Sequence, residues 1–393
     1  MKISVIVKQR LLVLLGALMV VVAATACVGG PTEVSWGHLS LVGEPQNLLF
    51  AFSDRIVLID PADGSPVELR DANGNVRVDD QGNPRLWEVR GAGNTPTQFY
   101  TSPVVIDDGR LLATAYTGRI YEVELDAARI VNPEGHPTEG HVVADTLATP
   151  EFLYVPLSDG GVEALSRPNL VHAWTFDAPE HGTWAQPLLV DDALYVTSLD
   201  HKLYALDPES GEELWQVDLR GAVASTPVYS DGYLYVGSFA RTLFKISTNG
   251  EIVAEFTTHD WVWGSPVLSD GVLYAADLGG FVYALEDNGG SFDAVWEARQ
   301  VATRAIRATP VVTGDRIIVA SRDHNTYWLN RDSGEEVFRR EMVGEVLSDL
   351  LLLEPSGTLG ISEPMVIVST MAHEELLAAF TVNDGIRQWV YRR

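Results

Sequence analysis

A repeat of about forty residues runs through most of the 393-residue chain and limits what it can fold into. The clearest copy reads Thr226-Pro-Val-Tyr-Ser-Asp-Gly-Tyr-Leu-Tyr-Val-Gly-Ser-Phe-Ala-Arg-Thr-Leu-Phe-Lys-Ile-Ser247. We align the copies on the middle residue of a Leu-Tyr-Ala-Leu-Asp-like run and call that residue the anchor. The eight anchors are Leu58, Glu122, Ala164, Ala205, Lys245, Ala284, Trp328 and Ala379. Successive anchors are 64, 42, 41, 40, 39, 44 and 51 residues apart. Four short strands with their turns need about forty residues, the size of one propeller blade. The eight anchors therefore predict eight blades.

Each copy contains the signals of four strands, which we name A to D in chain order. Strand A follows a small polar residue and a proline, as at Thr226-Pro227 and Ser265-Pro266, and proline suits the first residue of a strand. Asp231-Gly232 and Asp270-Gly271 have the chemistry of tight A–B hairpins. Strand D carries one aromatic residue per copy, which is expected to pack between blades: Trp174, Trp215, Trp296, Phe338 and Trp389. The predicted fold is all-β, an eight-bladed β-propeller of four-stranded antiparallel blades.

The first 26 residues have the pattern of an export signal. Lys2, Lys8 and Arg10 precede an apolar stretch, and small residues stand just before Cys27, the single cysteine. Ala24-Thr25-Ala26-Cys27 resembles the lipobox of bacterial lipoproteins, in which the cysteine is acylated and becomes the mature N-terminus. An ordinary secretory signal or an uncleaved anchor helix remains the alternative. We expect a signal peptide at 1–26, a lipidated tether at 27–38 and the propeller at 39–393.

The charge balance is acidic, with 27 Lys and Arg against 54 Asp and Glu. Because so negative a surface repels phosphate backbones, we expect no nucleic-acid partner. A single cysteine also leaves the propeller without a disulfide, although an exported protein could form one.

The turns between strands C and D identify a repeat family. Asp207-Pro-Glu-Ser-Gly-Glu-Glu-Leu-Trp215 and Asn330-Arg-Asp-Ser-Gly-Glu-Glu-Val-Phe338 resemble the pyrroloquinoline-quinone-type propeller repeat, whose signature is Ala-x-Asp-x-x-Thr-Gly-x-x-x-Trp. The resemblance covers about residues 39–393 and is strongest from 186 to 340. With a lipobox and eight short blades, the chain is similar to the BamB lipoproteins. That resemblance implies a scaffold that binds a component of the β-barrel assembly machinery or a nascent envelope protein.

Three motifs resemble chemical sites. Asp200-His201 and Asp323-His324 look catalytic, but they occupy the same B–C turn column in different blades, so we expect turns. The stretch 71–83 has the oxygen spacing of a calcium loop, but Val76 and Gly82 stand where such a loop needs glycine and glutamate; an inserted hairpin is favoured. Glu134-Gly-His-Pro-Thr-Glu-Gly-His141 offers two histidines without a visible third zinc ligand, which favours a solvated loop.

The loops from strand D to the next strand A carry aromatic and basic residues. If strand A is innermost, these loops surround one mouth of the central channel, where such residues suit a protein partner. Leu219-Arg220-Gly221 also resembles the turn that BamB proteins present to the central assembly protein. The partner-binding candidates are Tyr100, Trp184, Leu219, Arg220, Trp261, Trp263, Arg304 and Arg307. The alternative is that they close the channel and stiffen the loops.

The leading hypothesis is a non-enzymatic, monomeric interaction propeller, exported and held on a membrane through Cys27. In a cell with an outer membrane it would lie on the periplasmic face of that membrane, and otherwise on the outer face of the cell membrane. We assign no catalytic, cofactor or metal residues. One alternative is a quinoprotein dehydrogenase, although the adjacent cysteine pair usual in that branch is absent. Another is a lipoprotein that binds a small ligand or peptide in the funnel.

Overall fold

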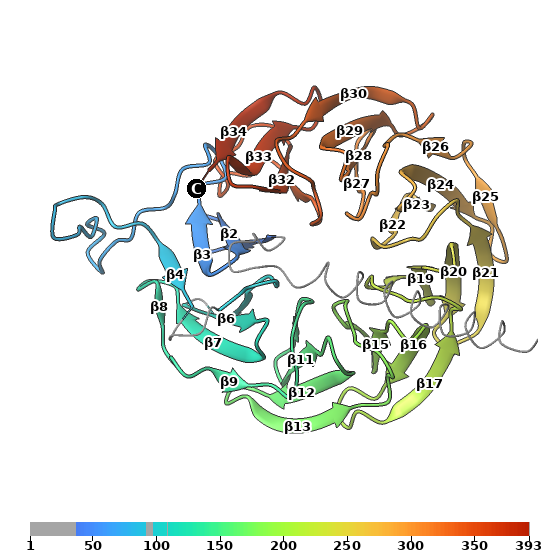
Figure 1. The fold of residues 1–393 in the computed structure, drawn as a ribbon, viewed down its shortest axis with the longest axis horizontal. Coiled ribbons are helices and arrows are strands. Elements are labelled where there is room, and N and C mark those ends of the chain that lie inside the picture. Colours follow the sequence, from blue (N-terminus) through green and yellow to red (C-terminus); the bar gives the residue numbers. More distant parts are fainter. Residues whose placement is uncertain (1–36, 92–96, 108, 393) are drawn as a thin grey trace, which may run out of the picture. The chain divides into compact units, whose positions relative to one another are not determined.

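A computed structural model describes residues 37–91, 97–107 and 109–392. In these residues every named element is a strand, and the strands form eight separate antiparallel sheets. Figure 1 shows the sheets as blades of one ring, following each other in chain order. The predicted eight-bladed propeller is therefore confirmed, and each anchor residue lies on the third strand of its blade. Within the described ranges, no helix is long and apolar enough to cross a membrane.

The first four blades occupy the chain up to Asp218. Blade 1 consists of β1 (His38–Val42), β2 (Asn47–Phe52), β3 (Arg55–Ile59) and β4 (Glu88–Arg90). Blade 2 consists of β5 (Val104–Asp107), β6 (Arg110–Ala115), β7 (Arg119–Glu124), β8 (Arg129–Ile130) and β9 (His136–Pro137). Blade 3 consists of β10 (Leu147–Ala148), β11 (Phe152–Pro156), β12 (Val162–Ser166) and β13 (Val171–Phe176). Blade 4 consists of β14 (Leu188–Val190), β15 (Ala193–Thr197), β16 (Lys202–Leu206) and β17 (Glu213–Asp218).

The last four blades follow the same order. Blade 5 consists of β18 (Val228–Ser230), β19 (Tyr233–Ser238), β20 (Thr242–Ser247) and β21 (Ile252–Thr257). Blade 6 consists of β22 (Val267–Ser269), β23 (Val272–Ala276), β24 (Phe281–Asp287), β25 (Phe292–Ala294) and β26 (Arg299–Gln300). Blade 7 consists of β27 (Val311–Thr313), β28 (Arg316–Ala320), β29 (Asn325–Asn330) and β30 (Glu336–Glu341). Blade 8 consists of β31 (Leu351–Leu353), β32 (Met365–Ala372), β33 (Glu375–Thr381) and β34 (Arg387–Tyr391).

The strand order within a blade follows the chain, as in β14-β15-β16-β17. Figure 1 shows the later strands of each blade at the rim of the ring, so strand A is innermost, as the loop argument required. In blades 2 and 6 the outer strand is broken into two pieces, β8 with β9 and β25 with β26, and both pieces pair with the same third strand.

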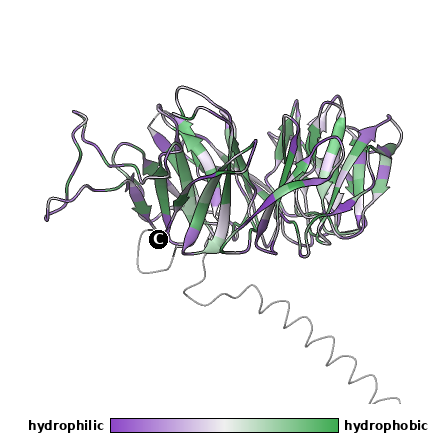
Figure 2. Cartoon of the chain, turned by 90° about the horizontal axis from the view of Figure 1, so that it is seen from above, coloured by the Kyte–Doolittle hydropathy of each residue, from purple (hydrophilic) through white to green (hydrophobic). Residues whose placement is uncertain are grey.

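Burial follows the position of a strand in its blade. The second and third strands are almost wholly buried, whereas the outer strand β17 alternates between exposed and half-buried residues. Figure 2 shows apolar residues, in green, along the strands and hydrophilic residues, in purple, mostly in loops and outer strands. Apolar side chains of adjacent blades form shared clusters, one of which joins Val196 and Tyr204 of blade 4 to Trp174 of blade 3. The core is therefore a chain of interfaces between blades, as expected for a repeat array.

The aromatic column of strand D joins each blade to the next. The indole N–H of Trp174 donates to the carbonyl oxygen of Pro208 at 3.2 Å, and that of Trp215 donates to Thr248 at 2.9 Å. In both cases the acceptor belongs to the C–D turn of the following blade. The glycine of that turn lies against the ring: a Cβ added to Gly211 would be 2.5 Å from Trp174. The motif therefore pairs the tryptophan of one blade with the glycine of the next.

The ring closes between blade 8 and blade 1, where the backbone N–H of Gln46 donates to the carbonyl oxygen of Thr358 at 3.0 Å and side chains pack across the junction. Each of these blades is built from one end of the described chain, so no strand crosses the junction. Trp389 of β34 is 7% exposed and donates its indole N–H to the carbonyl oxygen of Pro61 at 3.0 Å. Gly64 has a φ of 74°, and a Cβ there would lie 2.6 Å from the Trp389 ring. The same tryptophan–glycine pair that links other neighbouring blades thus also closes the ring.

The insertion in blade 1 accounts for the longest step of the repeat. Between β3 and β4 the chain forms an inserted arm with two short hairpins, closed by the bridges Arg70–Val76 and Val78–Pro84, above a base where Glu68 pairs with Leu86. Asp71 and Asp79 each open a turn: Oδ1 of Asp71 accepts the N–H groups of Asn73 and Asn75 at 2.9 Å, and Asp79 repeats the pattern. Stretch 71–83 is thus part of the expected hairpin, and its two aspartates hold their own turns.

Candidate interaction surface at the channel mouth

The D–A loops and the B–C turns lie at the same end of the ring, because strand direction alternates within each blade. Carboxylates in the B–C turns hold the loops in place. Asp277 accepts the backbone N–H of Asp260 at 2.9 Å, and Asp323 accepts that of Thr303 at 2.8 Å. The surface at this end is therefore built on loops whose backbone N–H groups are held by carboxylates of the B–C turns.

This arrangement explains the two Asp-His pairs of the sequence. Asp200 accepts the hydroxyl of Tyr204 at 2.6 Å, and Asp323 accepts that of Tyr327 at 2.7 Å. Burial raises the pKa of Tyr327, and its hydrogen bond to the Asp323 carboxylate raises it further. Burial alone would raise the pKa of Asp323, but the Tyr327 hydroxyl and the Thr303 N–H bring it below its ordinary value. Both aspartates therefore hold loops, as the turn interpretation predicted.

Five side chains from three D–A loops and one B–C turn form a continuous cluster, which we call the aromatic mouth: Trp184, Phe239, Trp261, Trp263 and Arg307. Phe239 stacks on Trp261 with ring centroids 5.0 Å apart and an interplanar angle of 10°. Phe239 also lies 5.3 Å from Trp263, whose ring is 6.3 Å from that of Trp184. The guanidinium carbon of Arg307 lies 3.6 Å from the centroid of the Trp263 ring, a cation–π contact.

A small cavity of about 220 Å³ opens beside the aromatic mouth. Its lining includes Trp184, Trp263 and Arg307, together with His38, Asp145 and Asp349. These residues come from blades all around the ring, so the cavity lies on the central axis. His38 Nδ1 is 3.5 Å from Asp145 Oδ1. Burial lowers the pKa of His38, but the charge and hydrogen bond of Asp145 outweigh it, so the pKa lies above its ordinary value.

The other predicted partner residues are not part of the aromatic mouth. Tyr100 lies against Tyr116, with ring centroids 5.6 Å apart, in blade 2. Arg220 forms an ion pair with Glu255 at 2.5 Å, and Arg304 forms one with Glu345 at 2.6 Å. Leu219 is 0% exposed and packs in the core, so only Arg220 of this turn reaches the surface. Expectation and structure differ here because the Leu219 side chain turns inward.

Sequence reasoning missed Phe239. It lies in the B–C turn of blade 5, whereas the predicted partner residues lie in D–A loops. The alternation of strand directions was the available signal, because it places B–C turns at the same end as the D–A loops. Cys27, the predicted lipidation residue, lies outside the described residues.

The histidine pair of the 134–141 loop is separated by its contacts. His141 Nδ1 lies 3.1 Å from Asp159 Oδ2, while His136 is on β9, paired with Ile120. Among the described residues, neither belongs to a group of three potential metal donors. Glu139, between them, does belong to such a group.

Comparison with known proteins identifies the repeat. The family model described as "Outer membrane protein assembly factor BamB" matches residues 72–216, 158–253, 199–304 and 279–393. The solved structure of BamB from Moraxella catarrhalis superposes with a TM-score of 0.62 at 15% identity, covering 88% of this chain and 96% of that one. A computationally designed protein, Ika8, gives 0.61 at 9% identity, covering 77% and 89%. At these identities the structural likeness concerns the fold alone. No curated protein sequence matches the chain.

Proposed function

The chain belongs to the family of the outer membrane protein assembly factor BamB, and we propose that it is a non-enzymatic, lipid-anchored interaction propeller that assists the assembly of outer-membrane β-barrel proteins. The observation that carries this proposal is the aromatic mouth. Trp261 is 48% exposed, and it is the only exposed tryptophan in the described ranges. A large aromatic side chain held at the surface by a second ring is typical of a binding anchor.

The aromatic mouth is organised before any partner arrives. Phe239 supports Trp261 from below, and Arg307 and Trp184 hold Trp263 from two sides. Because these rings are already fixed, a partner that covers them loses little side-chain entropy on binding. Tryptophan and arginine are also the residues most enriched among those that dominate binding energy.

The size of the axial cavity supports binding on the surface. Sites that enclose a drug-sized ligand occupy about 300–1,000 Å³. The cavity at the mouth is about 220 Å³, below that range. We therefore expect that a mixture of the purified protein with pyrroloquinoline quinone and Ca²⁺ has a visible absorbance spectrum equal to the sum of the spectra of its components. A new, stable absorbance band would instead favour the dehydrogenase hypothesis.

Site-specific photo-crosslinking in the native host tests the proposal. A photoreactive residue at position 261 reports on the aromatic mouth, and one at Asp231, in the A–B turn at the opposite end of blade 5, is the matched control. We expect position 261 to give a discrete adduct with a β-barrel assembly component or a nascent envelope protein, and Asp231 to give none. Equal crosslinking at both positions, or none at 261, would contradict the proposed interface.

The lipid anchor is tested by Cys27→Ser. Acylation of this cysteine would hold the protein on a membrane, because several acyl chains on one residue give stable attachment. We expect the variant to lose membrane attachment or to accumulate as a larger precursor, seen by membrane fractionation and electrophoretic mobility. Unchanged fractionation and mobility would show that the segment 1–26 is not a lipoprotein signal.

A further inference from the structure

Glu163 is a buried acid at a position that the other blades fill differently. It lies on β12, one residue before the anchor Ala164, and is 2% exposed. The corresponding residues of five other blades are aromatic and buried: Tyr121, Tyr204, Phe244, Tyr283 and Tyr327. The two remaining blades bury Val57 and Ala378 at this position. A carboxyl group in a column that otherwise buries aromatic or aliphatic side chains breaks the local pattern of the repeat, and such breaks are expected where a residue has a particular task.

One oxygen of Glu163 has a structural role. Its Oε2 accepts the backbone N–H of Glu139 at 3.0 Å, as Asp277 and Asp323 accept loop N–H groups in blades 6 and 7. In those blades a B–C turn aspartate does this work, with the help of a tyrosine hydroxyl. The loop contact therefore accounts for Oε2 of the carboxylate.

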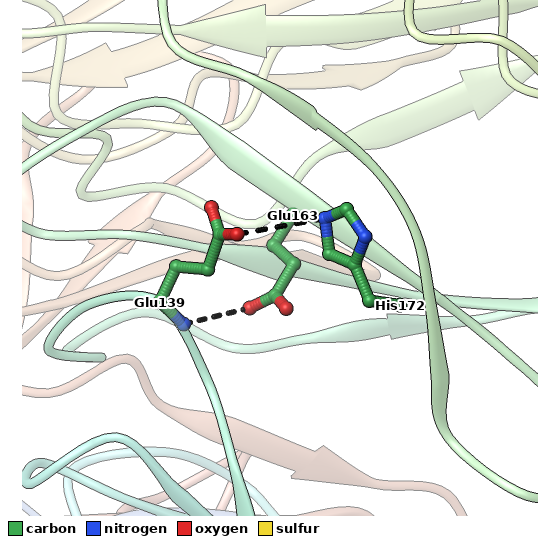
Figure 3. Close-up of side chains that lie close together, drawn as sticks. All are labelled: Glu139, Glu163 and His172. Atoms are coloured by element: carbon green, nitrogen blue, oxygen red, sulfur yellow. Dashed lines mark hydrogen bonds and ion pairs between the residues drawn. The ribbon is translucent and has the colours of Figure 1, made fainter.

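Glu139 and His172 complete a group around this carboxylate. The donor atoms of Glu139, Glu163 and His172 all lie within 4.8 Å of one another, and Figure 3 shows them converging from a loop and two adjacent strands. Glu139 Oε1 is 3.6 Å from His172 Nε2. Thr175, which is opposite Glu163 in the strand register, donates its hydroxyl to Glu139 Oε2 at 2.8 Å.

A β-bulge brings His172 to the correct side of its strand. Residues three apart on a regular strand point to opposite faces. The register of β12 and β13 shifts between Ala164 and Leu165, and the extra residue on β13 restores His172 and Thr175 to one face. Their contact confirms this, with Nε2 of His172 2.9 Å from Oγ1 of Thr175.

The charge of the group favours a cation. The carboxylates of Glu139 and Glu163 lie within 4.8 Å of each other, and Glu163 is 2% exposed. Two glutamates that share one histidine thus carry an unfavourable concentration of negative charge at neutral pH. A divalent cation between them would offset the repulsion and the desolvation of Glu163 together.

We propose that Glu139, Glu163 and His172 bind one divalent transition-metal ion of the zinc type. Zn²⁺ takes imidazole and carboxylate ligands at about 2.0–2.2 Å, so two ligands on one tetrahedral ion lie about 3.4 Å apart. The Glu139–His172 distance of 3.6 Å is already close to that, and both side chains are about half exposed. Calcium and magnesium require six or more oxygen ligands, which this mixed set does not resemble. Three protein ligands leave a fourth coordination position for water.

Zinc titration of the full-length protein tests the site. Calorimetry is expected to find one Zn²⁺ per chain, and Zn²⁺ but not Mg²⁺ is expected to raise the melting temperature, because binding to the folded state stabilises it. Glu163→Gln is the informative variant, since its amide oxygen can still accept the Glu139 N–H while losing the charged ligand. We expect Glu163→Gln and His172→Gln each to weaken zinc binding at least tenfold and to remain folded without metal.

The matched control is His141→Gln, two residues from Glu139 in the same loop but outside the proposed ligand set. It should bind zinc with the affinity of the parent protein. Loss of binding in His141→Gln alone would assign the ion to the histidines of the 134–141 loop and overturn the proposal. The proposal would also be overturned if Glu163→Gln and His172→Gln bound zinc with the same affinity as the parent protein. It would equally be overturned if the parent protein bound no zinc at micromolar concentrations.

Discussion

Trp389→Ala is expected to lower the free energy of unfolding by about 3–5 kcal/mol, the range for removing a buried tryptophan. The indole is 7% exposed, donates to the Pro61 carbonyl oxygen and covers Gly64, so its loss opens a cavity at the junction of blades 8 and 1. No strand spans this junction in the described chain, so it is closed by contacts between the two blades, and the packing of Trp389 is one of them. Equilibrium unfolding in guanidinium chloride, followed by circular dichroism, measures the change.

Trp215→Ala provides the comparison. Trp215 stands at the same position of blade 4 and makes the same kind of hydrogen bond, to Thr248 of blade 5. It is only half buried, and the two blades that it joins are also consecutive in the chain. Because less apolar surface is lost, we expect a smaller destabilisation than for Trp389. If Trp389→Ala changed stability by less than about 1 kcal/mol, the range of an ordinary surface substitution, closure would depend instead on contacts such as that between Phe50 and Tyr391.

Trp261→Ala is expected to weaken partner binding by about 2 kcal/mol, or roughly 30-fold, while stability changes by less than about 1 kcal/mol. The side chain is 48% exposed and rests on Phe239, so its removal deletes a contact surface and leaves the core in place. Quantitative affinity capture of the crosslinked partner, beside thermal unfolding of the same samples, separates the two effects.

Leu214→Ala is a suitable control, because Leu214 is 52% exposed but lies on the outer strand β17, away from the D–A loops. It should change neither capture nor stability appreciably. Undiminished capture by Trp261→Ala would show that the aromatic mouth is not the interface. Destabilisation as large as that of Trp389→Ala would show that the exposed indole is a packing residue.

Much of the architecture could be predicted from the sequence. The anchors lie on the third strand of each blade, and the prolines and Asp-Gly pairs mark the starts of strands and their hairpins. These signals are local: strand alternation, turn chemistry and repeat length need only neighbouring residues to be recognised. The aromatic column of strand D was also predictable as packing, because one residue recurs at a fixed distance from a glycine turn.

The candidate site was only partly predictable. The sequence placed Trp184, Trp263 and Arg307 in equivalent loops, and the structure brings them together around one cavity. It grouped Leu219 with Arg220 as well, but chain neighbours at a turn can point in opposite directions, and Leu219 is buried. Phe239 and the group around Glu163 were missed because each joins residues from different columns of the repeat.

The sequence by itself thus determined the repeating unit, the number of units and the order of strands within each. Tertiary structure alone decided which side chains of different loops meet, how Trp389 closes the ring on Pro61, and that Glu139 faces Glu163 and His172 and not the histidines beside it. The physical reason is that a repeat encodes the geometry of one blade. Contacts between blades and across loops depend on how the packed blades are oriented, and a bulge or a single inward side chain is enough to change them.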